Sequence, residues 1–118
     1  MEIYNSSFQG CGLSGAIQLP SISTMGTYCF SNTGITSVDF TGSTLTTWSR
    51  CLNGMSHLDN ITLPNTLTTI DNSLNFDMQS LRWVKCPCIT PPTVSLPNGC
   101  FTNCNAYFYV PDSSLSSY

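Results

Sequence analysis

The sequence predicts a β-rich repeat solenoid of about four to five turns, each of about 22–23 residues, with a parallel sheet on one face and little helix. Two observations carry this prediction: a fixed apolar period, and an alternation of apolar and polar residues inside each repeat. The apolar triplets are Ile35, Val38 and Phe40, then Leu58, Ile61 and Leu63, then Leu81, Val84 and Cys86, with a constant spacing from each triplet to the next. Within Ile61-Thr62-Leu63 the apolar residues face one way and Thr62 the other, as in a strand.

The chain of 118 residues has room for a single domain, residues 1–118. We expect it to be a fragment of a longer solenoid, because Ile3 and Tyr4 resemble the end of an earlier repeat. Repeats are expected near residues 8–29, 30–51, 52–73, 74–100 and 101–118. The residues expected to build the core are Ile35, Val38, Phe40, Leu58, Ile61, Leu63, Leu67, Ile70, Leu74, Leu81, Val84, Phe101, Phe108 and Val110.

The repeats differ in detail along the chain. In the first, Leu13, Ile17 and Leu19 are the expected anchors, with one extra residue between Leu13 and Ile17. The second and third predict a strand, a turn and a second short strand, which ends at Trp48 or Ile70.

The fourth repeat departs from the pattern after Cys86, where the Pro-rich residues 87–93 replace the second strand. Proline cannot donate to a sheet ladder, so we expect a loop or an edge there, with five additional residues. After Val110, Asp112 or Ser113 is suited to cap a short helix.

Composition excludes several partners. Only 8% of the residues are charged and 41% are hydrophobic, which indicates a core under a surface of Ser, Thr and Asn. Arg50, Arg82 and Lys85 are the three basic residues against six acids, so the chain lacks the cationic footprint that nucleic acid requires. No run of 18 apolar residues occurs, so we expect no membrane insertion.

Three motifs together resemble the BspA-type leucine-rich repeat proteins, a class with repeats of about 23 residues. They are the segment from Leu58 to Ile70, the step Phe101-Thr102-Asn103-Cys104, and the closing segment from Tyr107 to Ser113. The resemblance covers about Ser7 to Val110. Departures are the extra residue before Ile17, the Pro-rich segment, and Thr33 and Met55 where the family often has Cys or Asn.

This resemblance implies a curved solenoid that presents a sheet as a binding surface, commonly for adhesion to host or matrix proteins. It also implies an extracellular or cell-surface location in bacteria. The ligand must still be argued from the surface residues, because a fold alone does not define a function.

Seven cysteines raise the question of disulfides or zinc, since Cys86-x-Cys88 and Cys100-x-x-x-Cys104 are within reach of metal-ligand spacings. The repeat register favours buried structural thiols instead, because Cys86 occupies the apolar position of Leu63 and Phe40. Disulfides and a metal site remain alternatives, and Cys88 is the least explained.

No catalytic residue or cofactor is predicted. His57 is the only histidine and has no recognisable arrangement with a nucleophile. The glycines form neither GxGxxG nor a P-loop, so no nucleotide is expected.

The candidate binding residues are the outward-facing residues of the expected strands, which become aromatic and basic toward the C-terminus: Asp39, Trp83, Lys85, Tyr107 and Tyr109. Exposed Trp and Tyr beside a cation are typical anchors of protein contacts. The alternative is that the Pro-rich segment or a terminal helix covers them.

We therefore expect a non-enzymatic module for protein interaction or adhesion, or alternatively a structural spacer in a surface or phage-fibre protein. Exposed sheet edges at both ends also predict end-to-end self-association.

Overall fold

A computed structural model describes residues 1–49, 54–71, 80–94 and 106–117. The strands are β1 (Glu2–Ile3), β2 (Ser14–Gln18), β3 (Thr24–Met25), β4 (Gly34–Asp39), β5 (Thr47–Ser49), β6 (Asn60–Thr62), β7 (Thr69–Asp71), β8 (Trp83–Lys85), β9 (Thr93–Val94) and β10 (Tyr107–Tyr109). The 3-10 helix η1 (Asp112–Ser117) follows, with Asp112 in its first turn.

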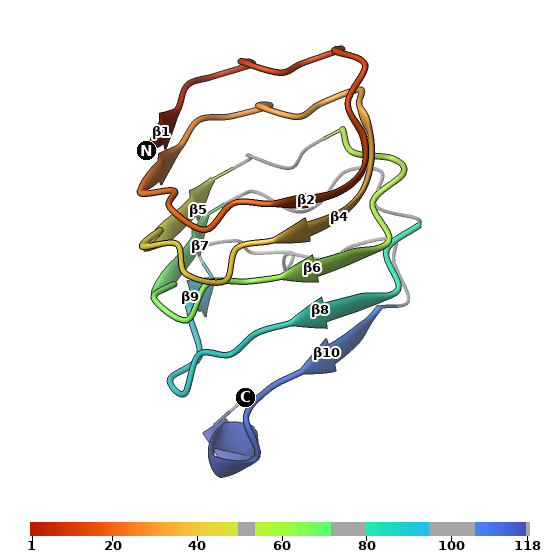
Figure 1. Cartoon of the computed structure of the whole chain (residues 1–118). Helices are drawn as coiled ribbons and strands as arrows, with labels where there is room; N and C mark the ends of the chain where they lie inside the picture. The colour runs from red at the N-terminus through yellow and green to blue at the C-terminus, as the bar shows by residue number, and fades with distance from the viewer. Residues whose placement is uncertain (50–53, 72–79, 95–105, 118) are drawn as a thin grey trace.

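The even-numbered strands form one five-stranded parallel sheet in the order β10-β8-β6-β4-β2 (Figure 1). The register of this sheet reproduces the sequence period, since Val38 pairs with Ile61 and Ile61 pairs with Val84. The constant offset between these residues is therefore one full turn of the chain.

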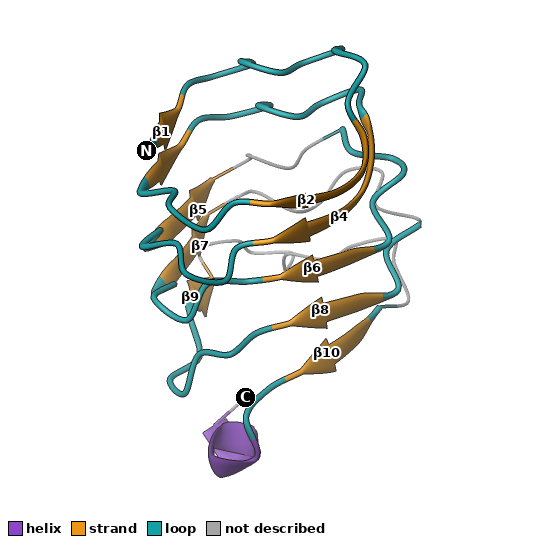
Figure 2. Cartoon of the chain, in the orientation of Figure 1, coloured by secondary structure: helices purple, strands orange, loops and turns teal. Residues whose placement is uncertain are grey.

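The odd-numbered strands form a second stack opposite the first, and loops join the two (Figure 2). In it β5, β7 and β9 make a three-stranded parallel sheet, and β1 pairs separately with β3. The prediction of a β-rich solenoid with a parallel sheet and little helix is confirmed. The turn count differs slightly: within the described residues, three turns carry a strand of both larger sheets, those of β4–β5, β6–β7 and β8–β9.

The first repeat differs from the prediction. Ile17 pairs with Val38 as expected, but Gly15 and not Leu13 pairs with Ile35, and the register shifts after Gly15. The irregularity therefore lies in β2, where Gly15 to Ile17 spans two positions against the three from Ile35 to Val38, so Thr36 stands opposite no residue of β2. Leu13 is 38% exposed, so it is not a core anchor.

The first turn also contains a short second strand that sequence reasoning missed. Thr24–Met25 forms β3, and Ile22 and Met25 are buried. Ile22 stands one repeat period before Leu45, so it occupies the same place in its turn.

The Pro-rich segment was predicted as a loop or an edge with five additional residues. The expectation that it replaces the second strand was wrong, because it leads into β9, at one edge of the three-stranded sheet, where Thr93 pairs with Thr69. The five additional residues were counted between Leu74 and Phe101, which lie outside the described residues. Phe108 pairs with Val84, and the offset between these two exceeds the offset between Ile61 and Val84 by a single residue.

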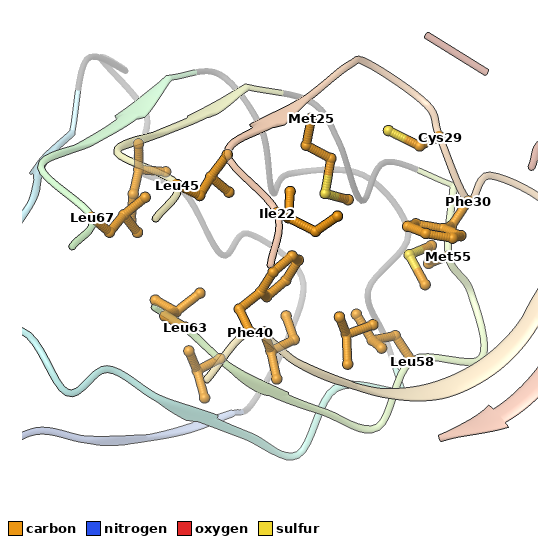
Figure 3. Packing of buried hydrophobic residues seen from close by; sticks show 14 of the residues in the cluster. Ile22, Met25, Cys29, Phe30, Phe40, Leu45, Met55, Leu58, Leu63 and Leu67 are labelled. Atoms are coloured by element: carbon orange, nitrogen blue, oxygen red, sulfur yellow. The ribbon is translucent and has the colours of Figure 1, made fainter. Parts of the chain in front are cut away.

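The core lies between the two stacks, and the ring of Phe40 points into it beside Ile22 (Figure 3). Ten of the residues named above as core anchors are buried: Ile35, Val38, Phe40, Leu58, Ile61, Leu63, Leu67, Ile70, Leu81 and Val84. Val110 is half-buried against this cluster. Leu74, Phe101 and the side chain of Phe108 lie outside the described residues.

Hydrogen bonds between successive turns extend beyond the strands. The N–H groups of Phe8 and Gly10 donate to the carbonyls of Cys29 and Ser31, at 2.8 Å each. On the other side the Thr66 hydroxyl donates to the carbonyl of Leu45 at 2.7 Å. Each turn thus satisfies backbone groups of its neighbour, and stability comes from the interfaces between turns.

This register predicts opposite effects for two adjacent substitutions. Ile61 is fully buried, so Ile61→Asp places an unpaired charge in the core and should cost more than about 4 kcal/mol, enough to unfold the chain. Thr62 is outward and half-buried, with Asp39 and Lys85 on the strands either side, so Thr62→Asp should change stability by less than about 1 kcal/mol. Thermal unfolding followed by circular dichroism measures both, and equal melting temperatures would contradict the register.

Candidate binding surface

The outward residues of the five-stranded sheet form two rows that cross the strands. One row contains Ser37, Asn60, Trp83 and Tyr107, and the other contains Asp39, Thr62, Lys85 and Tyr109. Neighbouring strands lie about 4.8 Å apart, so successive side chains in a row are within contact distance. The first row is aromatic on both β8 and β10, and the second has Lys85 on β8 and Tyr109 on β10.

Trp83 and Tyr109 are in direct contact across β8 and β10. Their ring centroids lie 6.3 Å apart with an interplanar angle of 82°, an edge-to-face arrangement. This geometry places the positive edge of one ring against the negative face of the other and favours the pair beyond its buried area. Together with Lys85 they line a hollow of about 340 Å³.

The aromatic residues are open to solvent. Tyr107 is 74% exposed and Tyr109 is 57% exposed, Lys85 is exposed, and Trp83 is half-buried. The short helix η1 follows β10 and lies beyond its end in Figure 2. Trp83, Lys85, Tyr107 and Tyr109, which we call the aromatic-lysine group, are therefore accessible in the described part of the chain, and neither the Pro-rich segment nor η1 buries them.

Lys85 and Arg82 differ in how their charges are balanced. The Arg82 Nε lies 2.7 Å from Asp59 Oδ1, so the charge of Arg82 is neutralised by an ion pair. Within the described residues Lys85 makes no such pair. Lys85 is left as the cation available to a ligand beside the aromatic rings.

Asp39 is not brought together with the other candidates. It lies on β4, two strands away from Lys85, with Thr62 between them. Its Oδ1 accepts hydrogen bonds from the N–H and the hydroxyl of Thr41, at 2.9 and 2.6 Å. Asp39 therefore holds the turn after β4 in shape.

A polar network on the same face was missed by sequence reasoning. The Ser37 hydroxyl donates to Asn60 Oδ1 at 2.7 Å, and Asn60 Nδ2 donates to Asp59 Oδ2 at 3.0 Å. Asp59 in turn pairs with Arg82. The signal was present in the sequence, because Ser37 and Asn60, like Asp59 and Arg82, are one repeat period apart.

Cys29 and Cys88 are buried inside the solenoid. Cys29 Sγ donates to the Gly26 carbonyl at 2.6 Å, and burial raises the pKa of the Cys29 thiol to about 11. Cys88 Sγ lies 3.3 Å from the Pro64 carbonyl, and burial, followed by the charge of Cys86, raises the pKa of the Cys88 thiol to about 11. A raised pKa keeps both thiols protonated and unreactive.

The described part of the chain contains no side-chain cluster suited to a metal ion. Cys11, Cys29, Cys86 and Cys88 are thiols, and among the described residues no group of three or more His, Cys, Asp or Glu side chains is placed to hold a metal. Cys51, Cys100 and Cys104 lie outside those residues. His57 is exposed on a turn.

The N-terminal end of the solenoid is apolar. The rings of Phe8 and Phe30 stack with centroids 5.4 Å apart and an interplanar angle of 5°. Phe8 is 41% exposed and Tyr4 is 72% exposed, and a hollow of about 380 Å³ opens between Ile3, Phe8 and Ile17. Strands β1 and β2 each end a sheet there.

Two stacks of parallel strands, in which each turn takes about 22–23 residues, define a repeat solenoid of the leucine-rich class. Comparison with protein families names it more closely: the model for the BspA type leucine-rich repeat region matches residues 1–107 in six copies. The chain belongs to this family, whose members are repeat modules that often act in protein interaction or adhesion, typically at the cell surface or in secreted proteins. Comparisons with curated proteins and with solved structures gave no match. Among the described residues, no helix has the length and apolarity of a membrane span.

The buried thiols predict slow alkylation. In the folded protein at about pH 8, iodoacetamide should modify the half-exposed Cys11 and leave Cys29 and Cys88 intact, and denaturant should equalise the three. Mass spectrometry of the peptides measures each site. Modification of Cys29 or Cys88 at the rate of Cys11 would contradict their burial.

The same thiols predict a loss of stability in alkali. Folding raises the pKa of the Cys29 and Cys88 thiols from 9.0 to about 11, so both thiols stay protonated to a higher pH in the folded state than in the unfolded state. Their contribution to stability is complete below pH 9.0 and is lost as the pH rises toward 11. A Cys29→Ala variant, compared with the parent chain by urea unfolding, should show a smaller decline over this window, and an identical decline would contradict the assignment.

Proposed function

We propose that the chain is a non-enzymatic binding module of a bacterial surface or secreted protein, and that it holds a protein partner, such as a host or matrix protein, through the aromatic-lysine group. The observation that carries this proposal is the edge-to-face pair of the half-buried Trp83 and the exposed Tyr109, with the cation of Lys85 beside it. Family membership supports a role in interaction or adhesion in general.

Aromatic side chains make effective anchors because they bury a large area with few rotatable bonds, so a bound partner gains contact at a low cost in side-chain entropy. Trp83 is already held by Tyr109, which lowers that cost further. Lys85 adds charge complementarity, which selects among partners more than it adds affinity.

In this proposal Asp39 lies at the edge of the binding surface and does not contact the partner directly. Its carboxylate shapes the turn that borders the sheet, so a change at Asp39 alters the margin of the binding surface and not its centre.

A structural spacer is the second candidate. The hydrogen bonds between successive turns, such as those from Phe8 and Gly10 to the following turn, favour a stiff rod that separates other domains. A spacer does not need its outward side chains, whereas a binding module does, so substitution of the aromatic residues separates the two.

Self-association is a third property to propose, and the apolar N-terminal end supports it. Phe8, Tyr4 and Leu13 are exposed beside the unpaired edge of β2. An edge strand with exposed apolar neighbours is a template for pairing with another chain, so we propose end-to-end contacts between copies.

Trp83→Ala should abolish binding to immobilised extracellular-matrix proteins while the chain remains folded. Removal of a central aromatic anchor commonly costs at least about 2 kcal/mol of binding free energy, a loss of about 30-fold in affinity. Surface plasmon resonance against a panel of matrix proteins measures the change, and circular dichroism verifies the fold.

Tyr4→Ala is the matched control, because Tyr4 is an aromatic residue of similar exposure to Tyr107 at the opposite end of the solenoid. It should leave matrix binding unchanged. If neither Trp83→Ala nor Tyr107→Ala alters any interaction of the folded chain, the binding proposal is wrong and the spacer is favoured.

A further inference from the structure

The hollow at the aromatic-lysine group does not end at Lys85. Lys85 also lines a second hollow of about 260 Å³, whose walls include Thr62 and Asn65. The first hollow is lined by Trp83, Lys85 and Tyr109. Because both hollows are lined by Lys85, they lie on either side of this residue or next to each other along it.

A third hollow lies at the turns after β6 and β8. It has a volume of about 510 Å³ and shares Asn65 and Pro87 with the second. Thr66, Thr68 and Thr90 line it further on. The three hollows, which we call the surface track, follow one another through these shared residues, from the aromatic rings to the turns after β6 and β8.

The lining of the surface track mixes hydroxyl and amide groups with apolar side chains, and it is almost uncharged. The Thr62 hydroxyl and the Asn65 amide can both donate and accept hydrogen bonds, so they match a ligand whose own groups do both. The Thr66 and Thr68 hydroxyls already donate to the carbonyls of Leu45 and Thr46, so they offer acceptors. Sugar hydroxyls have this property. A pyranose ring also has an apolar face of C–H groups, which fits the negative face of an aromatic ring such as Trp83 or Tyr109.

The track carries a positive charge at one place. Lys85 lines both of the first two hollows, and within the described structure it makes no ion pair, whereas Arg82 is neutralised by Asp59. The carboxylate of Asp39 accepts hydrogen bonds from Thr41 and is separated from Lys85 by the strand that carries Thr62. An anionic group on the ligand is therefore favoured at Lys85.

We infer that the surface track binds an anionic oligosaccharide. One sugar ring packs on Trp83 and Tyr109, a carboxylate or sulfate pairs with Lys85, and the following ring donates to and accepts from Thr62 and Asn65. This inference rests on the proposed function, since it uses the same aromatic-lysine group, and adds that the partner is recognised through sugar that it carries. Bare polypeptide is favoured less, because its anchor side chains need enclosed apolar pockets.

Isothermal titration calorimetry of the whole chain tests this with hyaluronan hexasaccharide, chondroitin sulfate hexasaccharide, and sialyllactose with lactose as its neutral counterpart. Sialyllactose should bind about tenfold more tightly than lactose, and Lys85→Gln should remove that difference without changing the affinity for lactose. Trp83→Ala should weaken every sugar at least about tenfold. Raising the salt from about 0.05 M to about 0.5 M should weaken the anionic sugars for the parent chain and not for Lys85→Gln.

Arg82→Gln is the matched control, because it removes the same charge outside the surface track and should leave sialyllactose affinity within about twofold. Equal affinity of sialyllactose and lactose, or an anionic sugar whose binding is insensitive to Lys85→Gln, would overturn the inference. Sugar binding that is unchanged in Trp83→Ala would also overturn the inference, because the sugar would then bind at another site.

The matrix-protein panel separates this inference from the proposed function. If a matrix protein binds through Trp83 equally well before and after enzymatic removal of its glycans, and the three anionic sugars do not bind, the sugar inference is wrong and the protein-binding module stands. If neither sugars nor matrix proteins bind, both are wrong. Binding of a matrix protein that is lost on deglycosylation and competed by the sugars supports both.

Discussion

The register between turns is the constraint on which the rest of this structure depends. Val38 lies beside Ile61 and Ile61 beside Val84, so each buried side chain packs on its equivalent in the next turn. A slip of one residue would exchange the inward and outward faces of a strand. The same register therefore decides which residues make the core and which face the solvent.

The candidate binding surface is a consequence of that division. Outward positions such as Asn60, Trp83 and Tyr107 occupy one row because their inward neighbours are stacked, and not because they attract one another. The core accepts a narrow set of apolar residues at Ile61 and Val84, while the adjacent outward positions hold an amide, an indole and a phenol. The outward residues, and with them the ligands that the surface can bind, can therefore differ from turn to turn while the fold stays the same.

The fold could be predicted from the sequence because its information is local and periodic. The triplet Leu58, Ile61 and Leu63 repeats with a constant offset on both sides, and burial follows the offset. The first turn could not be predicted as well, because the register shift after Gly15 in β2 leaves no mark in the apolar pattern. Of the candidate site, the outward position of Trp83 and Lys85 follows from alternation alone. The contact of Trp83 with Tyr109 depends on rotamers, and the surface track depends on turn shape, so neither could be predicted from the pattern.

The polar network beside Trp83 has a consequence for the kinetics and cost of recognition. Ser37, Asn60, Asp59 and Arg82 connect three successive turns through hydrogen bonds and an ion pair. These contacts join the turns that contain β4, β6 and β8, and the Trp83 ring is held separately by Tyr109. A partner would meet a sheet that is already ordered, so it would lose little binding energy in ordering this surface, and binding would need no coupled folding.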